Sequence, residues 1–266
     1  MHSGNVMFNR EIAPGHFIMS ISVPEDFDVP APGQFVMLRF PGHLDPFLGR
    51  PLCVYGFERQ SDVNIFEVLY RVQGRGTSLL SHLREGDGLD VHGPLGTGFQ
   101  TPSSLAHVVL VAGGMGVAPI TFLASHFRHV SPFLKITCYL GSKSADCVFG
   151  LEKLQDFCTE VIVTTDDGTM GTCGFVTDLF FRDLDYMGGE DTRIYACGPY
   201  EMMKCLAESI DGREIICQVS LEERMACGIG ACLGCAVSLK KETGQSYYGR
   251  VCKDGPCFDI SRINWD

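Results

Sequence analysis

The sequence predicts an antiparallel β-barrel, then an α/β domain with a parallel sheet, and finally a small cysteine-rich C-terminal region. Three observations carry this prediction. Short β-prone segments separated by Pro and Gly clusters fill the N-terminal part of the chain. From His107 onward, apolar runs that end in glycines lead into segments with helical spacing. This alternation stops after about Gly212, and five of the 13 cysteines lie within residues 225–258.

The expected barrel strands are short and alternate with turn residues. We expect them at residues 16–23, 33–40, 50–57, 64–72 and 87–93. Several short strands at this spacing are typical of a small antiparallel barrel.

The middle of the chain reads as strands alternating with helices. The stretch "HVVLVAGG" (residues 107–114) is a buried strand that ends in glycines, and residues 117–127 after it have helical spacing. The pattern recurs around residues 134–142, 161–165 and 192–199. Such alternation implies a parallel sheet with helices on both faces. We therefore divide the chain into residues 1–101, 102–212 and 213–266.

Composition limits the kinds of function. The 266 residues carry a formal net charge of −11, which disfavours binding to nucleic acid or to an anionic membrane surface. No apolar run reaches the roughly 18 residues of a membrane-spanning helix. Eight of the cysteines are scattered without pattern, as expected of buried thiols in a reducing compartment. We expect a cytoplasmic protein that binds no nucleic acid.

The C-terminal cysteines form the most specific pattern. Cys227, Cys232 and Cys235 have the spacing C-x4-C-x2-C with interleaved glycines, and Cys252 follows later. This is the plant-type [2Fe–2S] spacing. The alternatives are a four-cysteine zinc site, which usually has two separated pairs, and plain buried thiols. Spacing alone does not choose between Cys252 and Cys257 as the fourth ligand.

Two glycine-containing turns predict a nucleotide site. The stretch "VAGGMGVAPI" (residues 111–120) ends a strand and opens a helix, where a diphosphate can approach backbone N–H groups. It lacks the G-x-G-x-x-G fingerprint, so ordinary loop geometry is the alternative. The stretch "ACGPYEMM" (residues 196–203) ends a later strand, and ligands of open α/β sheets bind beyond the carboxyl ends of strands. The pair favours a nucleotide crevice.

Three further stretches lie in the barrel region. They are "RPLCVY" (residues 50–55), "YRVQGRGT" (residues 70–77) and "GPLGTGF" (residues 93–99). An arginine at a strand start can neutralise a phosphate, and a glycine turn with a hydroxyl offers donors. A solvated charge and ordinary hairpin turns are the alternatives for each one taken alone.

In this order the motifs resemble the ferredoxin–NADP reductase superfamily. More closely, they resemble the iron–sulfur electron-transfer subunits of class 1B dihydroorotate dehydrogenases. The resemblance covers nearly the whole chain, including "DDGTMGTCGFVTDL" (residues 166–179) and the ending E-x-x-M-A-C-G-I-G-A-C-x-x-C with V-C-K-D-G-P. The ending is specific to that family, whereas the earlier motifs are shared across the superfamily.

The resemblance implies three cofactors and their residues. It assigns FAD to residues 1–101, NAD(H) to residues 102–212 and a [2Fe–2S] cluster to residues 213–266. The implied FAD-binding residues are Arg50, Pro51, Leu52, Cys53, Tyr70, Arg71, Val72, Gly76 and Thr77. The implied NAD-binding residues are Gly113, Gly114, Gly116, Cys197, Gly198 and Pro199, and the implied cluster ligands are Cys227, Cys232, Cys235 and Cys252. Two residues depart from the family pattern: Cys53 replaces the usual hydroxyl, and Cys257 is an extra thiol.

The resemblance also implies a function in pyrimidine biosynthesis. NAD(H) would exchange a hydride with FAD, and FAD would exchange single electrons with the cluster. The implied partner is an FMN-containing catalytic subunit that oxidises dihydroorotate to orotate, in a heterotetramer with two copies of each subunit. The residues leave the choice between NADH and NADPH open, because Lys143 is the one candidate partner for a 2′-phosphate in its loop and a single lysine there is more often solvated. The resemblance favours NADH.

Other functions remain open at this stage. The same reductase module could serve a hydrogenase, a glutamate-synthase-like enzyme or a transhydrogenase. A non-enzymatic redox sensor or a zinc-stabilised binding module is the alternative from another class, because a fold does not fix a function.

Overall fold

The computed structural model describes residues 1–42, 45–185, 191–241 and 243–265, and the chain divides into two compact units. We call the first the barrel unit; it consists of Met1–Gly98, Glu222–Ala236 and Arg250–Pro256. We call the second the sheet unit; it consists of Phe99–Leu221, Val237–Gly249 and Cys257–Asp266. The cysteine-rich tail is therefore shared between the two units.

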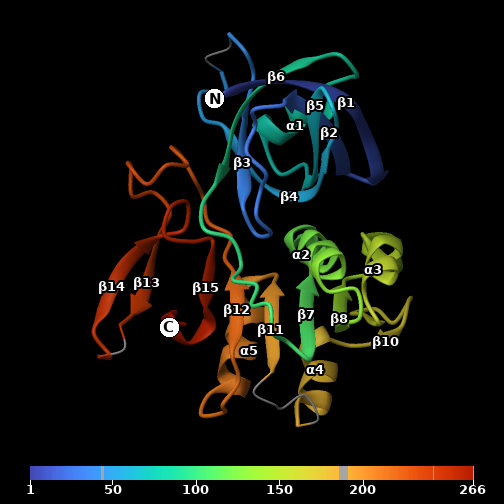
Figure 1. Ribbon diagram of the computed structural model, residues 1–266, viewed down its shortest axis with the longest axis vertical. Coiled ribbons are helices and arrows are strands. Elements are labelled where there is room, and N and C mark those ends of the chain that lie inside the picture. The colour runs from blue at the N-terminus through green and yellow to red at the C-terminus, as the bar shows by residue number, and fades with distance from the viewer. Residues whose placement is uncertain (43–44, 186–190, 242, 266) are drawn as a thin grey trace. The chain divides into compact units, whose positions relative to one another are not determined.

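The barrel unit is built on a closed six-stranded barrel with the strand order β1-β2-β5-β4-β3-β6 (Figure 1). Neighbouring strands pair antiparallel. The strands are β1 (His2–Ala13), β2 (His16–Pro24), β3 (Phe35–Arg39), β4 (Arg50–Arg59), β5 (Val63–Arg71) and β6 (Gly88–Leu95). The short helix α1 (Arg75–Ser81) lies between β5 and β6 in the chain. The predicted antiparallel barrel is confirmed.

The barrel interior is filled by alternate side chains of its strands. Met19 and Ile21 of β2, Val36 of β3 and Phe66 and Val68 of β5 are fully buried. Since successive residues of a strand point to opposite faces, Met19 and Ile21 share one face of β2, and Phe66 and Val68 share one face of β5. Strand β3 is buried on both faces, because its first four residues are all buried. All five strands that the sequence predicts are present.

Strand β1 was not predicted from the sequence. Its residues, HSGNVMFNREIA, are mostly polar and only weakly alternating in burial. It pairs with β2 along its length and with β6 near its start, and so closes the barrel. Pairing with β2, the next strand, and with the distant β6 therefore decides its conformation, because local β-propensity is weak here.

The sheet unit contains a seven-stranded sheet with the order β10-β9-β8-β7-β11-β12-β15. All pairings are parallel except that of β12 with the edge strand β15. The strands are β7 (His107–Gly113), β8 (Lys135–Ser142), β9 (Glu160–Thr165), β10 (Thr172–Cys173), β11 (Thr192–Cys197), β12 (Cys217–Ser220) and β15 (Cys257–Asp259). The predicted parallel-sheet domain is confirmed. The sheet continues past Gly212 into β12, whereas the sequence suggested that it ended there.

Four α-helices connect the parallel strands. They are α2 (Val117–Val130), α3 (Leu151–Phe157), α4 (Val176–Leu184) and α5 (Tyr200–Ile210), and short 3₁₀ turns are η1 (Gly114–Gly116), η2 (Ala145–Cys147) and η3 (Ile260–Arg262). Helix α2 packs beside α3, and α4 packs beside α5 (Figure 1). The strand order reverses between β7 and β11, which makes the carboxyl ends of these two strands the topological switch point where ligands of such sheets bind.

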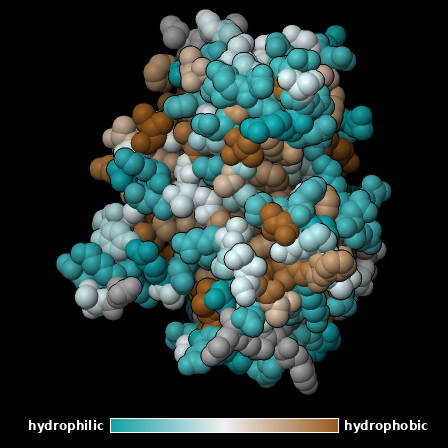
Figure 2. Space-filling model, in the orientation of Figure 1, coloured by the Kyte–Doolittle hydropathy of each residue, from teal (hydrophilic) through white to brown (hydrophobic). Residues whose placement is uncertain are grey.

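A small two-stranded sheet, β13 (Ala236–Lys240) with β14 (Ser246–Arg250), completes the fold. On the face shown in Figure 2, hydrophobic residues form several separate groups among hydrophilic ones. Within the described part of the chain, no helix combines the length and the apolar character needed to cross a bilayer.

Candidate functional site

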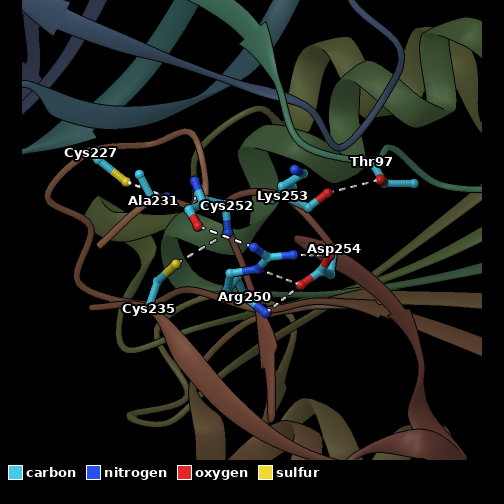
Figure 3. A network of polar contacts seen from close by, with 9 residues as sticks. Thr97, Cys227, Ala231, Cys235, Arg250, Cys252, Lys253 and Asp254 are labelled. Atoms are coloured by element: carbon cyan, nitrogen blue, oxygen red, sulfur yellow. Dashed lines mark hydrogen bonds and ion pairs between the residues drawn. The ribbon is translucent and has the colours of Figure 1, made fainter. Parts of the chain in front are cut away.

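The four cysteines of the predicted cluster motif lie together in the barrel unit. Cys227, Cys232 and Cys235 belong to an irregular segment, residues 227–235, which we call the cluster loop. Cys252 belongs to the turn at residues 250–254, which we call the cluster turn (Figure 3). The set extends from the interior to the surface, because Cys235 and Cys252 are buried, Cys227 is partly exposed and Cys232 is exposed.

The four thiols form one interacting group, because Cys227 also acts on Cys252. The thiol of Cys227 interacts with that of Cys232, and the thiol of Cys235 with that of Cys252. Among the described residues, no three His, Cys, Asp or Glu side chains converge on one metal position. Two thiolates per iron is the ligation of a two-iron cluster. A four-cysteine zinc site would use the same four thiolates.

Each of the four sulfurs accepts a hydrogen bond from a backbone N–H group. The donors and sulfurs are Gly230 to Cys252 (3.1 Å), Ala231 to Cys227 (3.3 Å), Gly234 to Cys232 (3.4 Å) and Cys252 to Cys235 (3.4 Å). Backbone donors that point at sulfur stabilise negative charge on it, as cluster-binding loops require.

The pKa values of two of these thiols move in opposite directions. Hydrogen bonding from backbone N–H groups, that of Ile229 foremost, lowers the pKa of Cys227 to about 6. Burial, together with its neighbour Cys235, raises the pKa of Cys252 to about 12. The backbone amides favour the thiolate form of Cys227, whereas burial disfavours the thiolate form of Cys252 unless a cation is bound nearby. Both effects are consistent with a site that binds a cationic group.

Cys257, the other candidate for fourth ligand, lies in a different setting. It is a buried residue of strand β15 in the sheet unit, where its backbone pairs with Ser220 of β12. Its position in a strand explains its presence without a ligand role. Cys252 is the cysteine that lies with the other three.

At the barrel, Arg50 meets the start of helix α1. The Arg50 side chain lies so close to Gly76 that a Cβ there would be 2.7 Å from its Nη1. The same guanidinium donates to the carbonyls of Gly49 (2.9 Å) and Leu48 (3.0 Å). The Thr77 hydroxyl accepts from the N–H groups just before the helix. The strand start and the glycine turn predicted to hold a phosphate are thus adjacent.

Further along strand β4, Cys53 lies near two charged groups. Burial and the carboxylate of Glu222 raise the pKa of the Cys53 thiol to about 12. Desolvation also raises the pKa of Glu222, and this outweighs the opposite effect of Arg71. Glu222 nevertheless keeps an accessible surface, as does Arg71. A thiol, a carboxyl and a guanidinium are therefore grouped at this end of the barrel.

The other predicted barrel residues differ in accessibility. Pro51, Leu52 and Val72 are partly exposed. Tyr70 is buried, stacks on Phe17 and donates its hydroxyl to Asn9 (3.0 Å). Its side chain therefore serves the barrel core, and a ligand beside it would meet the backbone.

In the sheet unit, the two predicted glycine turns lie side by side. Strands β7 and β11 are parallel neighbours, with Ala112 opposite Cys197. A Cβ on Gly116 would lie 2.1 Å from the carbonyl oxygen of Cys197, so the two turns touch through their backbones. Gly113 and Gly198 both pack on Met202, and Pro199 precedes helix α5. Gly114 has open space beside it. All six predicted residues are thus gathered at the switch point.

Two polar residues were not predicted as site residues. Ser220 ends β12 opposite Cys197, and its buried hydroxyl has no hydrogen-bond partner within the described residues. Glu222 is the first residue of the quoted motif E-x-x-M, to which no role was given. Glu222 could have been found from that motif, whereas nothing in the sequence around Ser220 marks it.

Two known domain families match the chain. The family described as "Iron-sulfur cluster binding domain of dihydroorotate dehydrogenase B" matches residues 222–264. The family described as "Oxidoreductase NAD-binding domain" matches residues 110–208. The first match covers the cluster loop and the cluster turn, and the second covers both glycine turns.

Curated relatives match along nearly the full length. Two of these relatives carry the name "Dihydroorotate dehydrogenase B (NAD(+)), electron transfer subunit". That of Desulforamulus reducens is 35% identical over 255 residues, covering 96% of this chain and 95% of the relative. That of Caldanaerobacter subterraneus subsp. tengcongensis is 40% identical over 253 residues, covering 95% and 94%.

Solved structures agree with the fold. A structure of an NADH-dependent reduced ferredoxin–NADP oxidoreductase matches with a TM-score of 0.83 and 29% identity, over 98% of this chain and 90% of that one. Phthalate dioxygenase reductase matches with a TM-score of 0.65 and 16% identity, over 94% and 76%. The second likeness concerns the fold alone.

Proposed function

Because the chain belongs to the family of electron transfer subunits of dihydroorotate dehydrogenase B (NAD(+)), we propose that it carries electrons between NAD(H) and a catalytic partner that oxidises dihydroorotate to orotate in pyrimidine biosynthesis. The observation that carries this proposal is the group of four cysteine sulfurs, each of which accepts a hydrogen bond from a backbone N–H. Such a set has little use in a nucleotide-binding protein that exchanges hydride alone.

We propose that Cys227, Cys232, Cys235 and Cys252 hold a [2Fe–2S] cluster. When bound, such a cluster transfers one electron at a time. The four cysteines would supply thiolates, and the backbone N–H groups of the cluster loop would stabilise the charge that collects on sulfur. The match of residues 222–264 to an iron–sulfur family supports this assignment over zinc.

FAD is proposed for the barrel unit. When bound, FAD links the two-electron chemistry of NAD(H) with one-electron transfer. The proposed binding residues are Arg50, Pro51, Leu52, Cys53, Tyr70, Arg71, Val72, Gly76 and Thr77. The guanidinium of Arg50 against Gly76 offers a cation and a close backbone approach for a phosphate. Tyr70 would contribute its backbone, because its side chain lies in the core.

The carboxyl ends of β7 and β11 form the proposed NAD(H) site. Gly113, Gly114 and Gly116 would let the diphosphate approach the start of helix α2, and Cys197, Gly198 and Pro199 would form the opposite wall. The unpartnered hydroxyl of Ser220 fits a polar ligand at these strand ends. NADH is preferred over NADPH, in agreement with the relatives named for NAD(+).

We assign FAD, NAD(H) and the cluster to residues 1–101, 102–212 and 213–266 as binding functions. These ranges differ from the compact units, because the cluster loop and cluster turn pack with the barrel. The proposed partner is an FMN-containing catalytic subunit, with two copies of each subunit in the complex. The exposed Cys232, flanked by the exposed apolar side chains of Ile229 and Leu233, is suited to contact such a partner.

The test is an anaerobic pull-down of the tagged chain from its source cells. The eluate is assayed for reduction of NAD+ that depends on dihydroorotate, and its visible spectrum is recorded. Co-purification of a flavoprotein with this activity is the expected result. A different partner without the activity would refute the pyrimidine assignment, and a colourless chain would refute the cofactors as well.

A further inference from the structure

Arg250 and Asp254 form an ion pair beside Cys235 and Cys252 (Figure 3). The Arg250 Nε and Nη2 atoms donate to Asp254 Oδ2 (2.9 Å) and Oδ1 (3.0 Å), so the contact is bidentate. The two side chains are 30% and 38% exposed. An exposed pair of this kind adds little to stability.

The pair closes the cluster turn around Cys252. The backbone N–H of Arg250 donates to Asp254 Oδ2 (2.8 Å), and the carbonyl of Arg250 accepts from the N–H groups of Asp254 (2.8 Å) and Lys253 (3.1 Å). Backbone and side-chain bonds thus join the same two residues, which lie two positions before and after Cys252. The guanidinium is thereby held in one orientation.

The third contact of the guanidinium reaches the cluster loop. Arg250 Nη1 donates to the carbonyl oxygen of Gly230 (3.1 Å). This carbonyl belongs to the same planar peptide group as the N–H of Ala231, which donates to the sulfur of Cys227 (3.3 Å). Arg250 therefore holds one end of a peptide whose other end faces a cysteine sulfur. Hydrogen bonds linked through one peptide polarise one another and strengthen both contacts.

The preceding peptide group is fixed as well. The N–H of Gly230 donates to the sulfur of Cys252 (3.1 Å). Gly230 has φ +81, and a Cβ there would lie 2.7 Å from Cδ of Lys253. Glycine favours this backbone conformation and leaves room for the Lys253 side chain. The loop at Gly230 is therefore clamped between Cys252 and Arg250.

We infer that Arg250 is a positioning residue that raises the reduction potential of the cluster by orienting the Gly230–Ala231 peptide toward Cys227. Hydrogen bonds to the sulfurs and nearby positive charge both stabilise the reduced, more negative state. Asp254 holds the guanidinium in the orientation that reaches Gly230. This inference rests on the proposed function, since it needs a cluster on the four cysteines.

The experiment compares three variants of the full chain, purified anaerobically: R250Q, R250K and K253Q. R250Q removes the charge and the forked donor, whereas R250K keeps the charge but cannot serve Asp254 and Gly230 together. K253Q removes one positive charge from the same turn and leaves the guanidinium contacts in place. The readouts are iron and sulfide per chain, and the cluster's midpoint potential from a redox titration followed by EPR.

A lower potential in both R250Q and R250K, with a smaller shift in K253Q, is the expected result. R250K decides the matter if R250Q does not retain its cluster. A wild-type potential in R250K, or equal shifts in R250Q and K253Q, would mean that charge alone acts and would overturn the inference. Absence of iron and sulfide from the wild-type chain would overturn the proposed function itself, which separates the two failures.

Discussion

The candidate sites of the two units are built from different parts of the residues. In the barrel unit, the candidate site consists of side-chain groups, namely four cysteine sulfurs and the guanidinium of Arg50. In the sheet unit, the candidate site consists of backbone groups, because Gly116 and Cys197 touch through main-chain atoms at the ends of two adjacent strands. A cluster needs ligands with specific chemistry, whereas a diphosphate needs N–H groups and room.

This difference predicts how each site fails. A side-chain site is lost when one functional group is removed, and the fold around it can survive. A backbone site is lost when a single carbon is added, and the fold is damaged with it. The following substitutions test this contrast, from the largest expected effect to the smallest.

Cys232→Ser is expected to abolish the cluster and with it electron transfer to the partner. Oxidation of NADH by an artificial acceptor should stay near the wild-type rate, because neither glycine turn is altered. Visible and EPR spectra, together with both assays, measure this. Cys257→Ser is the matched control and should keep the cluster, since Cys257 is a strand residue. Normal electron transfer to the partner in Cys232→Ser would refute the ligand assignment.

Gly116→Ala should damage the sheet unit itself. The added Cβ would lie 2.1 Å from the Cys197 carbonyl oxygen, and relief requires a backbone shift that costs about 3 kcal/mol. The melting temperature and the affinity for NADH should both fall. The control is Gly88→Ala, where the nearest atom to the added Cβ, on Pro41, is 3.9 Å away. Unchanged stability and NADH affinity in Gly116→Ala would contradict the backbone contact.

Arg50→Ala should weaken FAD retention while the barrel stays folded. Loss of a charge-assisted bond to a phosphate corresponds to roughly a tenfold to hundredfold loss of affinity. Flavin per chain after dialysis, with circular dichroism for the fold, measures the effect. Arg59→Ala, at the exposed far end of the same strand, serves as the control. Equal flavin content in the two variants would rule out a phosphate contact at Arg50.

Glu222→Gln should have the smallest effect, and it depends on pH. Desolvation raises the pKa of Glu222 above the ordinary 4.5, so the folded protein binds this proton more tightly than the unfolded chain. Stability is unaffected by this group below pH 4.5 and falls as pH rises through the raised pKa. Removing the carboxyl should therefore stabilise the protein at pH 8, by less than about 1 kcal/mol because the side chain is accessible. Urea unfolding at pH 8 and pH 4 measures this, and an equal gain at both pH values would contradict it.

Most of the fold could be predicted from local pattern. Alternating segments predicted β2 to β6, and apolar runs ending in glycine predicted β7 and β8. The missed elements are short or polar. Helix α1 has seven residues, and β12 has four and stands directly before the cysteine-rich tail. Their conformation depends on neighbours distant in sequence, which no local pattern records.

The candidate site divides in the same way. The cysteine spacing pointed to a cluster because thiolate ligands are a chemical requirement that spacing expresses directly. The glycine turns were visible because close backbone approach excludes a Cβ. Glu222 and Ser220 were missed because an isolated carboxyl or hydroxyl becomes distinctive only through its surroundings.

The sequence by itself determined two architectures, a barrel and a parallel sheet, and two kinds of site, sulfur ligands and glycine turns. Each follows from residue type and spacing, which act locally. The tertiary structure decided which groups meet: Cys252 with the cluster loop, Arg250 with Gly230, and Gly116 with Cys197. These contacts join residues that are 20 positions apart for Gly230 and Arg250 and 81 positions apart for Gly116 and Cys197. Packing of the whole chain, and not local propensity, brings such residues together.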